Sequence, residues 1–196
     1  MDRTLQCQNR VRSLSVGEMK GTQLYQSNFQ TNVIMANTFS QIYIQIVFAV
    51  KNRNALIEPA WEESLYKYVT GIVQNKEQKI LAINGMPDHI HIFVGLKASC
   101  CVSDLVREIK KASSLFINEN QLSKYPFNWQ EGFGAFSYSH SHIDSVCKYI
   151  MNQKEHHKKL TFQNEYIQFL RNFNITYDDK YLFDWIEPAA SKTKYL

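Results

Sequence analysis

The stretch HIHIFVGL constrains the fold of this chain more than any other, because it alternates between two kinds of side chain. Successive side chains of a β-strand point to opposite faces, so Ile90, Ile92 and Val94 share one face. His89 and His91 lie on the other face, where the strand begins. A strand with one apolar face needs a core packed against that face, which predicts a sheet in a layered fold.

Residue periodicity predicts the other strands and the helices that cover the sheet. The predicted elements, in chain order, are a strand at 41–48, a helix at 59–75, strands at 79–84 and 89–96, a helix at 102–120, a short aromatic strand within 129–139, and helices at 142–160 and 165–173. The order β-α-β-β-α-β-α is typical of an α+β fold, with an antiparallel sheet flanked by helices. The ferredoxin-like and RRM-like folds are of this kind.

The first part of the chain differs from the remainder. Residues 1–34 are polar and show neither the strand period of 2 nor the helix period of 3.6, so we expect a poorly ordered extension. We expect one folded domain over residues 35–187 and a C-terminal tail over residues 188–196. A single domain with short additions suits a chain of 196 residues.

Composition narrows the setting of the protein. The net charge of +4 is compatible with a polyanionic partner but does not demand one. The longest apolar runs are too short to span a bilayer, and no charged-then-apolar leader opens the chain. The four cysteines include no CxxC pair, and Cys100 and Cys101 are adjacent, which suits no structural disulfide. We therefore expect a reduced, cytoplasmic protein that does not enter a membrane.

The two histidines of HIHIFVGL are candidate metal ligands. Side chains at i and i+2 of a strand lie about 7 Å apart on one face, so His89 and His91 can reach one divalent cation. The alternative is a pair of polar side chains that face water. An HxH pattern is short enough to arise by chance, so the pair alone leaves both interpretations open.

A second cluster of candidate residues lies in YIMNQKEHH, within the predicted helix at 142–160. Tyr149 and Gln153 are four residues apart and would share one helical face, with His156 and His157 one turn further on. A phenol beside a metal is a possible nucleophile, but its pKa of about 10 means that it needs a base or a polarised electrophile. Taken singly, these residues also suit a core aromatic, a surface amide and a charged helix end.

The two motifs together resemble those of a known family. PDHIHIFV followed downstream by YIxxQxxHH is similar to the HUH single-tyrosine transposases, which comprise the IS200-like enzymes and their REP-associated relatives. The resemblance runs from about residue 35 to residue 185. It implies that His89 and His91 are metal ligands, that Tyr149 is the nucleophile and that Gln153 is the third ligand. His157 is a possible alternative ligand.

The resemblance also implies a reaction and its partners. The expected activity is nicking and rejoining of single-stranded DNA at hairpin-bearing element ends, through a 5′-phosphotyrosine formed by Tyr149. The expected cofactor is Mg²⁺ or Mn²⁺, because phosphate and amide oxygens suit hard cations. The family further implies a homodimer.

Candidate DNA contacts lie outside the two motifs. Basic and hydroxyl side chains of the predicted helix at 102–120 could meet a hairpin backbone: Arg107, Lys110, Lys111 and Ser114. Aromatic side chains near the short strand could stack on bases: Trp129, Phe133, Phe136 and Tyr138. A solvated helix face and an aromatic core explain the same residues equally well.

Two other functions remain open from the residues alone. A metal-dependent phosphoesterase could use the same histidines with a water nucleophile and would form no covalent adduct. A non-catalytic RRM-like nucleic-acid-binding protein would carry the histidines incidentally and would need no metal.

Overall fold

The computed structural model describes residues 39–51 and 56–185. Its described part is an α+β fold with an antiparallel sheet flanked by helices, which confirms the predicted fold class. The predicted extension at 1–34, the tail at 188–196 and both ends of the predicted domain at 35–187 lie outside the described residues, so those boundaries stay predictions.

The four strands of the described sheet run antiparallel in the order β2-β3-β1-β4. Their bounds are β1 Ile42–Ala49, β2 Lys79–Met86, β3 His89–Leu96 and β4 Gly134–Tyr138. The central strands β1 and β3 pair along their full length, with Val47 opposite His91. The stretch HIHIFVGL therefore lies in the middle of the sheet, covered on both faces.

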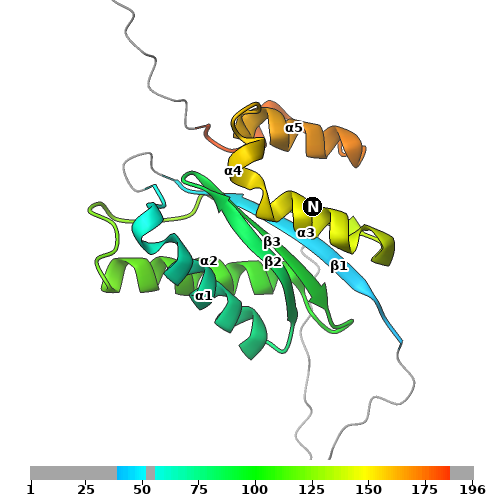
Figure 1. Cartoon of the computed structure of the whole chain (residues 1–196), viewed down its shortest axis with the longest axis horizontal. Helices are drawn as coiled ribbons and strands as arrows, with labels where there is room; N and C mark the ends of the chain where they lie inside the picture. Colours follow the sequence, from blue (N-terminus) through cyan, green and yellow to red (C-terminus); the bar gives the residue numbers. More distant parts are fainter. Residues whose placement is uncertain (1–38, 52–55, 186–196) are drawn as a thin grey trace, which may run out of the picture. The chain divides into compact units, whose positions relative to one another are not determined.

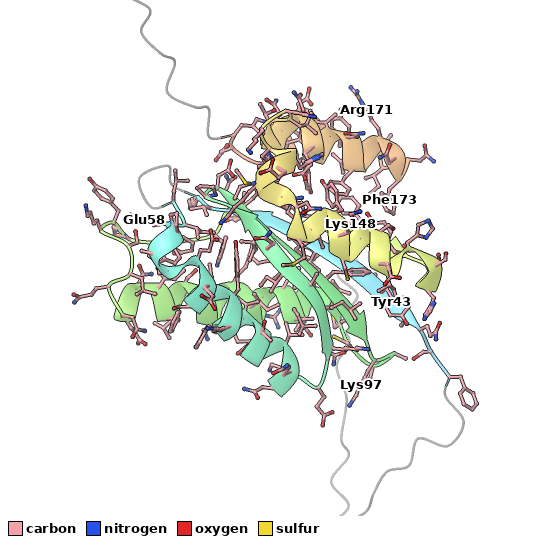
Figure 2. All side chains as sticks on the ribbon, viewed as in Figure 1. Tyr43, Glu58, Lys97, Lys148, Arg171 and Phe173 are labelled. Carbon is pink, nitrogen blue, oxygen red and sulfur yellow. The ribbon has the colours of Figure 1, made fainter. Side chains whose placement is uncertain are left out.

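Two layers of helices cover the sheet (Figure 1). Helices α1 (Pro59–Asn75) and α2 (Val102–Glu119) lie on one face. Helices α3 (Ile143–Met151), α4 (Gln153–His156) and α5 (Phe162–Asn172) lie on the other face. Side chains fill the space between each layer and the sheet (Figure 2).

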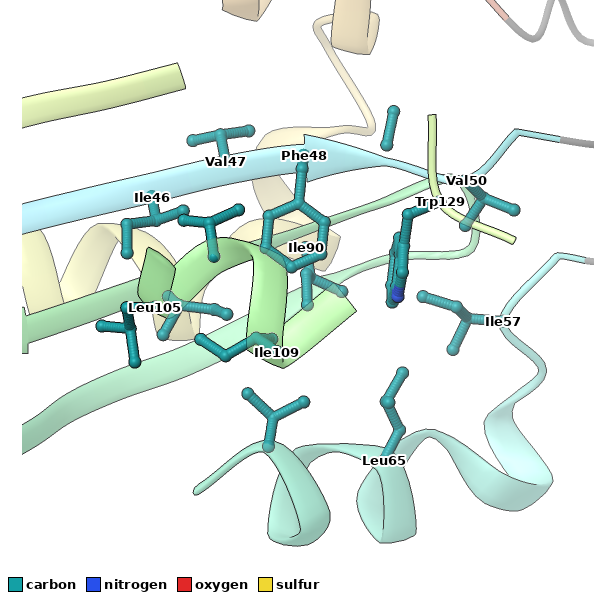
Figure 3. Packing of buried hydrophobic residues seen from close by; sticks show 14 of the residues in the cluster. Ile46, Val47, Phe48, Val50, Ile57, Leu65, Ile90, Leu105, Ile109 and Trp129 are labelled. Carbon is teal, nitrogen blue, oxygen red and sulfur yellow. The ribbon is translucent and has the colours of Figure 1, made fainter. Parts of the chain in front are cut away.

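The face toward α1 and α2 is apolar, as the alternation predicts. Ile90 of β3 and Phe48 of β1 are fully buried and meet Ile109 of α2 (Figure 3). Leu65 of α1 packs in the same cluster. This face holds the main hydrophobic core, whose burial supplies most of the driving force for folding.

The opposite face has a smaller apolar cluster and a polar end. There Phe93 of β3 and Ala82 of β2 pack against Val146 and Ile150 of α3. Toward the start of β3 the apolar residues of this face give way to buried polar ones. The polar end of this face is where α3, α4 and α5 converge (Figure 1).

The predicted single helix at 142–160 is wrong, because the chain forms α3 and α4 with a break at Asn152. The side-chain amide of Asn84 on β2 donates to the carbonyls of Ile150 (3.0 Å) and Met151 (2.9 Å). These carbonyls lie at the C-terminal end of α3, where helix groups lack partners within the helix. The amide of Asn84 thus satisfies the end of α3, and the chain turns before Gln153.

Helix α2 begins at the predicted residue, whereas helix α5 begins three residues before the predicted one. The sequence suggests Ser103 as the N-cap of α2, but the helix begins at Val102, after Cys101, so Ser103 lies inside the first turn. Helix α5 begins at Phe162, and the Thr161 side chain accepts from the backbone N–H of Asn164 as an N-cap. This cap adds a first turn that places Glu165 within the helix.

Candidate metal and tyrosine site

His89 and His91 are both fully buried, which excludes the interpretation that they face water. Their ring centroids lie 5.0 Å apart on the face of the sheet toward α3, α4 and α5. The ring of His89 stacks on Phe162 of α5 at 3.9 Å between centroids. Burial of two imidazoles side by side is costly unless their polar atoms have partners, so their hydrogen bonds decide what the pair can do.

In each of three histidines the ring nitrogen Nδ1 has a hydrogen-bond partner. His89 Nδ1 lies 2.7 Å from the carboxylate of Asp88, and His91 Nδ1 lies 2.9 Å from the side-chain amide of Gln45. His157 Nδ1 lies 2.8 Å from the carbonyl oxygen of Leu160. A metal-binding histidine usually has its second nitrogen held by such a carboxylate, amide or carbonyl.

The other nitrogen of each ring has no hydrogen-bond partner among the described residues. The Nε2 atoms of His89, His91 and His157 are buried and unsatisfied. If a metal binds Nε2 of His91, Nδ1 must carry the proton, and the Gln45 amide can accept it through its own unpartnered Oε1 after a half-turn. Gln45 is fully buried one diagonal position from His91, so it can fix the tautomer of that ring.

Glu165 of α5 lies at the centre of these nitrogens, with 2% of its surface exposed. Its Oε2 is 3.5 Å from His89 Nε2, 3.3 Å from His91 Nε2 and 3.2 Å from His157 Nε2. These distances allow attraction, although the angles do not make satisfied hydrogen bonds. Glu165 was not among the predicted site residues, and neither were Asp88 and Gln45.

A signal for Glu165 was nevertheless present in the sequence. The buried positions of α5 recur at helical spacing: Phe162, Glu165, Tyr166 and Leu170. A carboxylate on the apolar stripe of an amphipathic helix must find partners when that stripe is buried. Its partners, however, come from β3 and α4, and only the tertiary structure brings them together.

The cluster has the composition of a metal site. One ligand atom from each of His89, His91, His157 and Glu165 lies within 4.8 Å of the others. Gln153 is fully buried beside them, and its Oε1 has no hydrogen-bond partner among the described residues. Several orphaned lone pairs that converge on one point fit a bound cation better than they fit an apolar core.

Tyr149 reaches the same carboxylate from α3. Its hydroxyl donates to Glu165 Oε1, and the side-chain amide of Gln153 donates to the same oxygen at 3.1 Å. Tyr149 and Gln153 therefore lie side by side even though the helix breaks between them. Glu165 presents one oxygen to the tyrosine and the other to the histidines.

The electrostatics of the site depend on burial and on this carboxylate. Burial, and then the negative charge of Glu165, raise the pKa of Tyr149 above its usual value, so its hydroxyl holds its proton. Burial alone would raise the pKa of Glu165, but the surrounding histidines outweigh it and lower that pKa, so the carboxyl is ionised. Burial lowers the pKa of His91, which favours the neutral ring that a metal needs.

His89 is held differently from His91. Burial acts to lower its pKa, but the hydrogen bond to the carboxylate of Asp88 and the nearby negative charge of Glu165 outweigh burial and raise that pKa. Asp88 belongs to the tight turn between β2 and β3, close after Gly85, which pairs with Ile90. A Cβ at Gly85 would lie 2.3 Å from the backbone oxygen of His89, so only glycine allows this close turn.

The predicted DNA contacts on α2 gather away from this cluster. Arg107, Lys110, Lys111 and Ser114 line one surface groove with Trp129. Arg107 pairs with Asp104 at 2.8 Å, and Lys111 is exposed. Burial lowers the pKa of Lys110 to about 8, and its ammonium group donates to the carbonyl oxygen of Gln130 at 2.8 Å.

The burial of two predicted aromatic contacts argues against base stacking by them. Trp129 is 7% exposed, and its ring meets the edges of Phe48 and Phe127 while its indole N–H donates to Ser113 at 2.9 Å. Phe136 is 1% exposed and stacks on Phe169. Both residues belong to the core, because other side chains of the protein already cover their rings.

Comparison with known proteins identifies the family. Residues 38–153, more than half of the chain, match the family described as transposase IS200 like. The chain belongs to the IS200-like transposase family. This confirms the resemblance to the HUH single-tyrosine transposases. The match to the IS200-like family ends at Gln153, so His157 and Glu165 lie beyond it.

Two solved structures are similar to this IS200-like chain. One is a protein of Deinococcus radiodurans R1 provisionally assigned as a transposase, with 20% identity over 59% of this chain and 93% of that one, and a TM-score of 0.48. The other is a REP-associated tyrosine transposase bound to a REP hairpin, with 18% identity over 62% of this chain and 72% of that one, and a TM-score of 0.47. No curated protein sequence matches the chain.

Within the described ranges, no helix is both long enough and apolar enough to cross a membrane. The longest described helix, α2, carries charged residues on its outer face.

Proposed function

We propose that this IS200-like protein nicks and rejoins single-stranded DNA through a covalent bond between Tyr149 and a 5′-phosphate. One observation carries the proposal: Glu165 contacts the hydroxyl of Tyr149 with one oxygen and faces the free nitrogens of three histidines with the other. A nucleophile and a charge-stabilising site are thereby joined by a single side chain.

The chain's own residues support a short series of steps. The Tyr149 oxygen attacks phosphorus while its proton passes to Glu165 Oε1, which already accepts it in a hydrogen bond. The bond from phosphorus to the 3′-oxygen breaks, and that oxygen leaves as a 3′-hydroxyl after taking up a proton. Because one phosphodiester replaces another, the reverse step can rejoin the strand without ATP.

The residues that would hold a divalent cation are His89, His91 and His157 through Nε2, Glu165 through Oε2 and Gln153 through Oε1. Bound there, the ion supplies positive charge to a non-bridging phosphate oxygen. Of the two ions expected from the family, Mn²⁺ suits a set with three imidazoles better than Mg²⁺, which prefers oxygen ligands. The set extends the expected ligands His89, His91 and Gln153 by two residues.

Contacts to DNA and the assembly state complete the proposal. The groove on α2 with Arg107, Lys110, Lys111 and Ser114 would meet phosphates of a hairpin at the element end. The protein would act as a cytoplasmic homodimer. Tyr149 and His91 of one chain already lie 6.1 Å apart between ring centroids, so each subunit holds the parts of a site.

A trapping experiment tests the proposed reaction. Single-stranded oligonucleotides with a hairpin, labelled at the 5′ end or at the 3′ end, are incubated with the protein and Mn²⁺. Tyr149 attack leaves the label on the protein only when it lies 3′ of the cut, and Tyr149→Phe abolishes that covalent band. Tyr177→Phe, an exposed tyrosine outside the site, is the matched control and should trap DNA normally.

The same experiment separates the alternatives. A phosphoesterase with a water nucleophile would cut the strand without a covalent band and would keep cutting in Tyr149→Phe. A non-catalytic RRM-like binding protein would retain the oligonucleotide without cutting it. Either result would overturn the proposed reaction.

Subunit mixing tests how the site is assembled. His91→Ala and Tyr149→Phe proteins are each expected to be inactive. If exchange of subunits between them restores nicking, the tyrosine of one subunit serves the histidines of its partner. If subunits exchange and nicking does not return, each subunit uses its own Tyr149, as the arrangement within one chain favours.

The proposed boundary of the catalytic domain has its own test. A shortened chain that begins at Met35 should fold and trap DNA as the full chain does. Loss of solubility or of the covalent band in the shortened chain would assign a role to residues 1–34.

A further inference from the structure

Beside Tyr149 lies a cavity most of whose lining residues have no part in the proposed reaction. It has a volume of about 250 Å³ and lies between α3 and α5. On α5, Glu165, Gln168 and Asn172 face it at spacings of three, four and seven residues, which places them on one side of the helix. On α3, Tyr149 borders it. Figure 2 shows the two helices, with Lys148 on α3 and Arg171 on α5.

The lining combines aromatic surface with two side-chain amides. Phe169 and Tyr138 supply flat apolar surface, and Val146 of α3 is a buried part of the wall. Gln168 and Asn172 are exposed at the rim, and neither has a side-chain hydrogen bond among the described residues. Such a site offers a stacking surface with donors and acceptors at its edge.

The charge of the cavity decides which part of a nucleotide, the phosphate or the base, it can bind. None of the described residues that line it is a lysine or an arginine, and the ionised Glu165 lies at its inner end. A phosphate inside the cavity, away from the proposed cation, would be repelled by that carboxylate. A neutral, flat nucleobase suits the aromatic surface and the amides instead.

We propose that this cavity binds one unpaired nucleobase, that of a nucleotide joined to the phosphate that Tyr149 attacks. Gln168 and Asn172 read the edge of this base, and Phe169 provides a surface on which its ring packs. The inference rests on the proposed function, because it takes Tyr149 as the nucleophile and single-stranded DNA as the substrate.

The position of the nucleophile makes a neighbouring nucleotide the natural occupant. The Tyr149 side chain forms part of the cavity wall and also carries the oxygen that attacks phosphorus. The phosphate that this oxygen attacks has a nucleoside on each side, and the cavity that Tyr149 borders is open to one of them. The exposed cations Lys148 and Arg171 come from these same helices and could meet the next phosphates along the strand (Figure 2).

Recognition of a base by side-chain amides should give a measurable preference for one base over the others. A side-chain amide that pairs with a base edge typically gives discrimination on the order of tenfold or more against the wrong base. We therefore expect the wild-type protein to prefer one base at one position flanking the cut. The preference should fall to about threefold or less in Gln168→Ala or Asn172→Ala, since each removes one reader.

The first experiment measures cleavage of oligonucleotides that differ only beside the mapped cut. Each flanking position carries in turn the four bases or an abasic residue. An abasic residue should slow the wild-type protein more than it slows Gln168→Ala, which keeps only Asn172 and the ring of Phe169 as contacts to the base. Gln163→Ala and Asn164→Ala are matched controls, because both positions are exposed on α5 and lie outside the cavity. Unchanged base preference in both cavity variants would overturn the inference.

The second experiment does not depend on cleavage. The side-chain NH₂ signals of Gln168 and Asn172 are followed by NMR while adenosine, guanosine, cytidine or thymidine is added to the full chain. Nucleosides carry no phosphate, so a shift of these signals that saturates reports the base alone. We expect such a shift with at least one nucleoside and none at Gln163. No shift with any nucleoside, as when a partner subunit fills the cavity, would overturn the inference.

The two experiments keep the inference and the proposed function apart. Absence of a covalent Tyr149 adduct with every oligonucleotide would overturn the proposed function, whatever the nucleosides do. A normal adduct with no response to the flanking base, or with no nucleoside shift, would overturn the inference and leave the proposed reaction intact.

Discussion

The two faces of β3 differ more than any other two regions of this molecule, although the same eight residues supply both. Toward α1 and α2, Ile90 and Ile92 are buried among aliphatic and aromatic side chains. Toward α3, α4 and α5, His89 and His91 are buried equally deeply beside Glu165. One step along a strand thus separates a face that stabilises the fold from a face that carries its chemistry.

In the metal-free protein the apolar face stabilises the fold, whereas the polar end of the opposite face opposes folding. Each fully buried isoleucine contributes about 1.5–3 kcal/mol to folding. Each buried polar atom without a partner costs about 1–3 kcal/mol, and the histidine face holds several such atoms. A bound cation would satisfy them, so the histidine end of this face should stabilise the protein only when a cation is bound.

The largest effect that we expect comes from the apolar face. Ile92→Ala should lower the free energy of unfolding by about 2–5 kcal/mol, because it removes buried methyl groups and leaves a cavity. Its neighbour His91→Ala should instead abolish tight Mn²⁺ binding. Urea unfolding with chelator present and calorimetric Mn²⁺ titration measure the two effects. If Ile92→Ala weakens Mn²⁺ binding at temperatures where it is folded, the faces are not independent.

Metal loading should change stability through the histidine face alone. Mn²⁺ at about 100 times its dissociation constant should stabilise the fold by about 2.7 kcal/mol, a rise in Tm on the order of 5–10 °C. Differential scanning calorimetry with Mn²⁺, with Mg²⁺ and with EDTA measures this. The rise should be absent in His91→Ala and smaller with Mg²⁺. An equal rise in His91→Ala would place the bound ion elsewhere.

Glu165 is the residue that joins the tyrosine to the histidines, so its neutral isostere should affect both. Glu165→Gln keeps the shape of the side chain but removes the charge, and we expect the Mn²⁺ dissociation constant to rise about 10–100-fold. The covalent adduct should also form more slowly. Glu155→Gln on α4 is the control, because Glu155 is exposed and pairs only with Lys158 among the described residues.

Comparison of Gln153 and His157 variants would show how much each residue contributes to metal binding. Both point at the cluster, but an imidazole binds Mn²⁺ more strongly than an amide oxygen, which water can replace. Calorimetric titration should therefore show a several-fold loss of Mn²⁺ affinity in Gln153→Ala and a larger loss in His157→Ala. If His157→Ala keeps the wild-type Mn²⁺ affinity and Gln153→Ala loses it, Gln153 and not His157 is the third ligand.

The sequence was enough to predict the two faces of β3, but not the contacts that distant elements make on them. The period of 2 in HIHIFVGL was enough to place His89 and His91 on one face and the isoleucines on the other. The break at Asn152 was missed, since it depends on the Asn84 amide that reaches it from another strand. Glu165 was missed for the same reason, because its partners lie on β3, α3 and α4.

The smallest effect concerns the outer surface of α2, beyond the apolar face. Lys111 is exposed in the groove of predicted phosphate contacts, and it has no ion pair among the described residues. If it meets one phosphate, Lys111→Ala should reduce the slope of log affinity against log salt by about 1, equally for all sequences. At saturating DNA the covalent adduct should form at the wild-type rate, because the Tyr149 site lies across the sheet. Fluorescence anisotropy at several salt concentrations measures the slope.

Lys67→Ala on α1, whose lysine pairs with Glu63 at 2.8 Å, is the matched control. An unchanged slope would remove Lys111 from the DNA contacts, whereas a slower adduct at saturating DNA would show that α2 and the tyrosine site are coupled through the core that separates them.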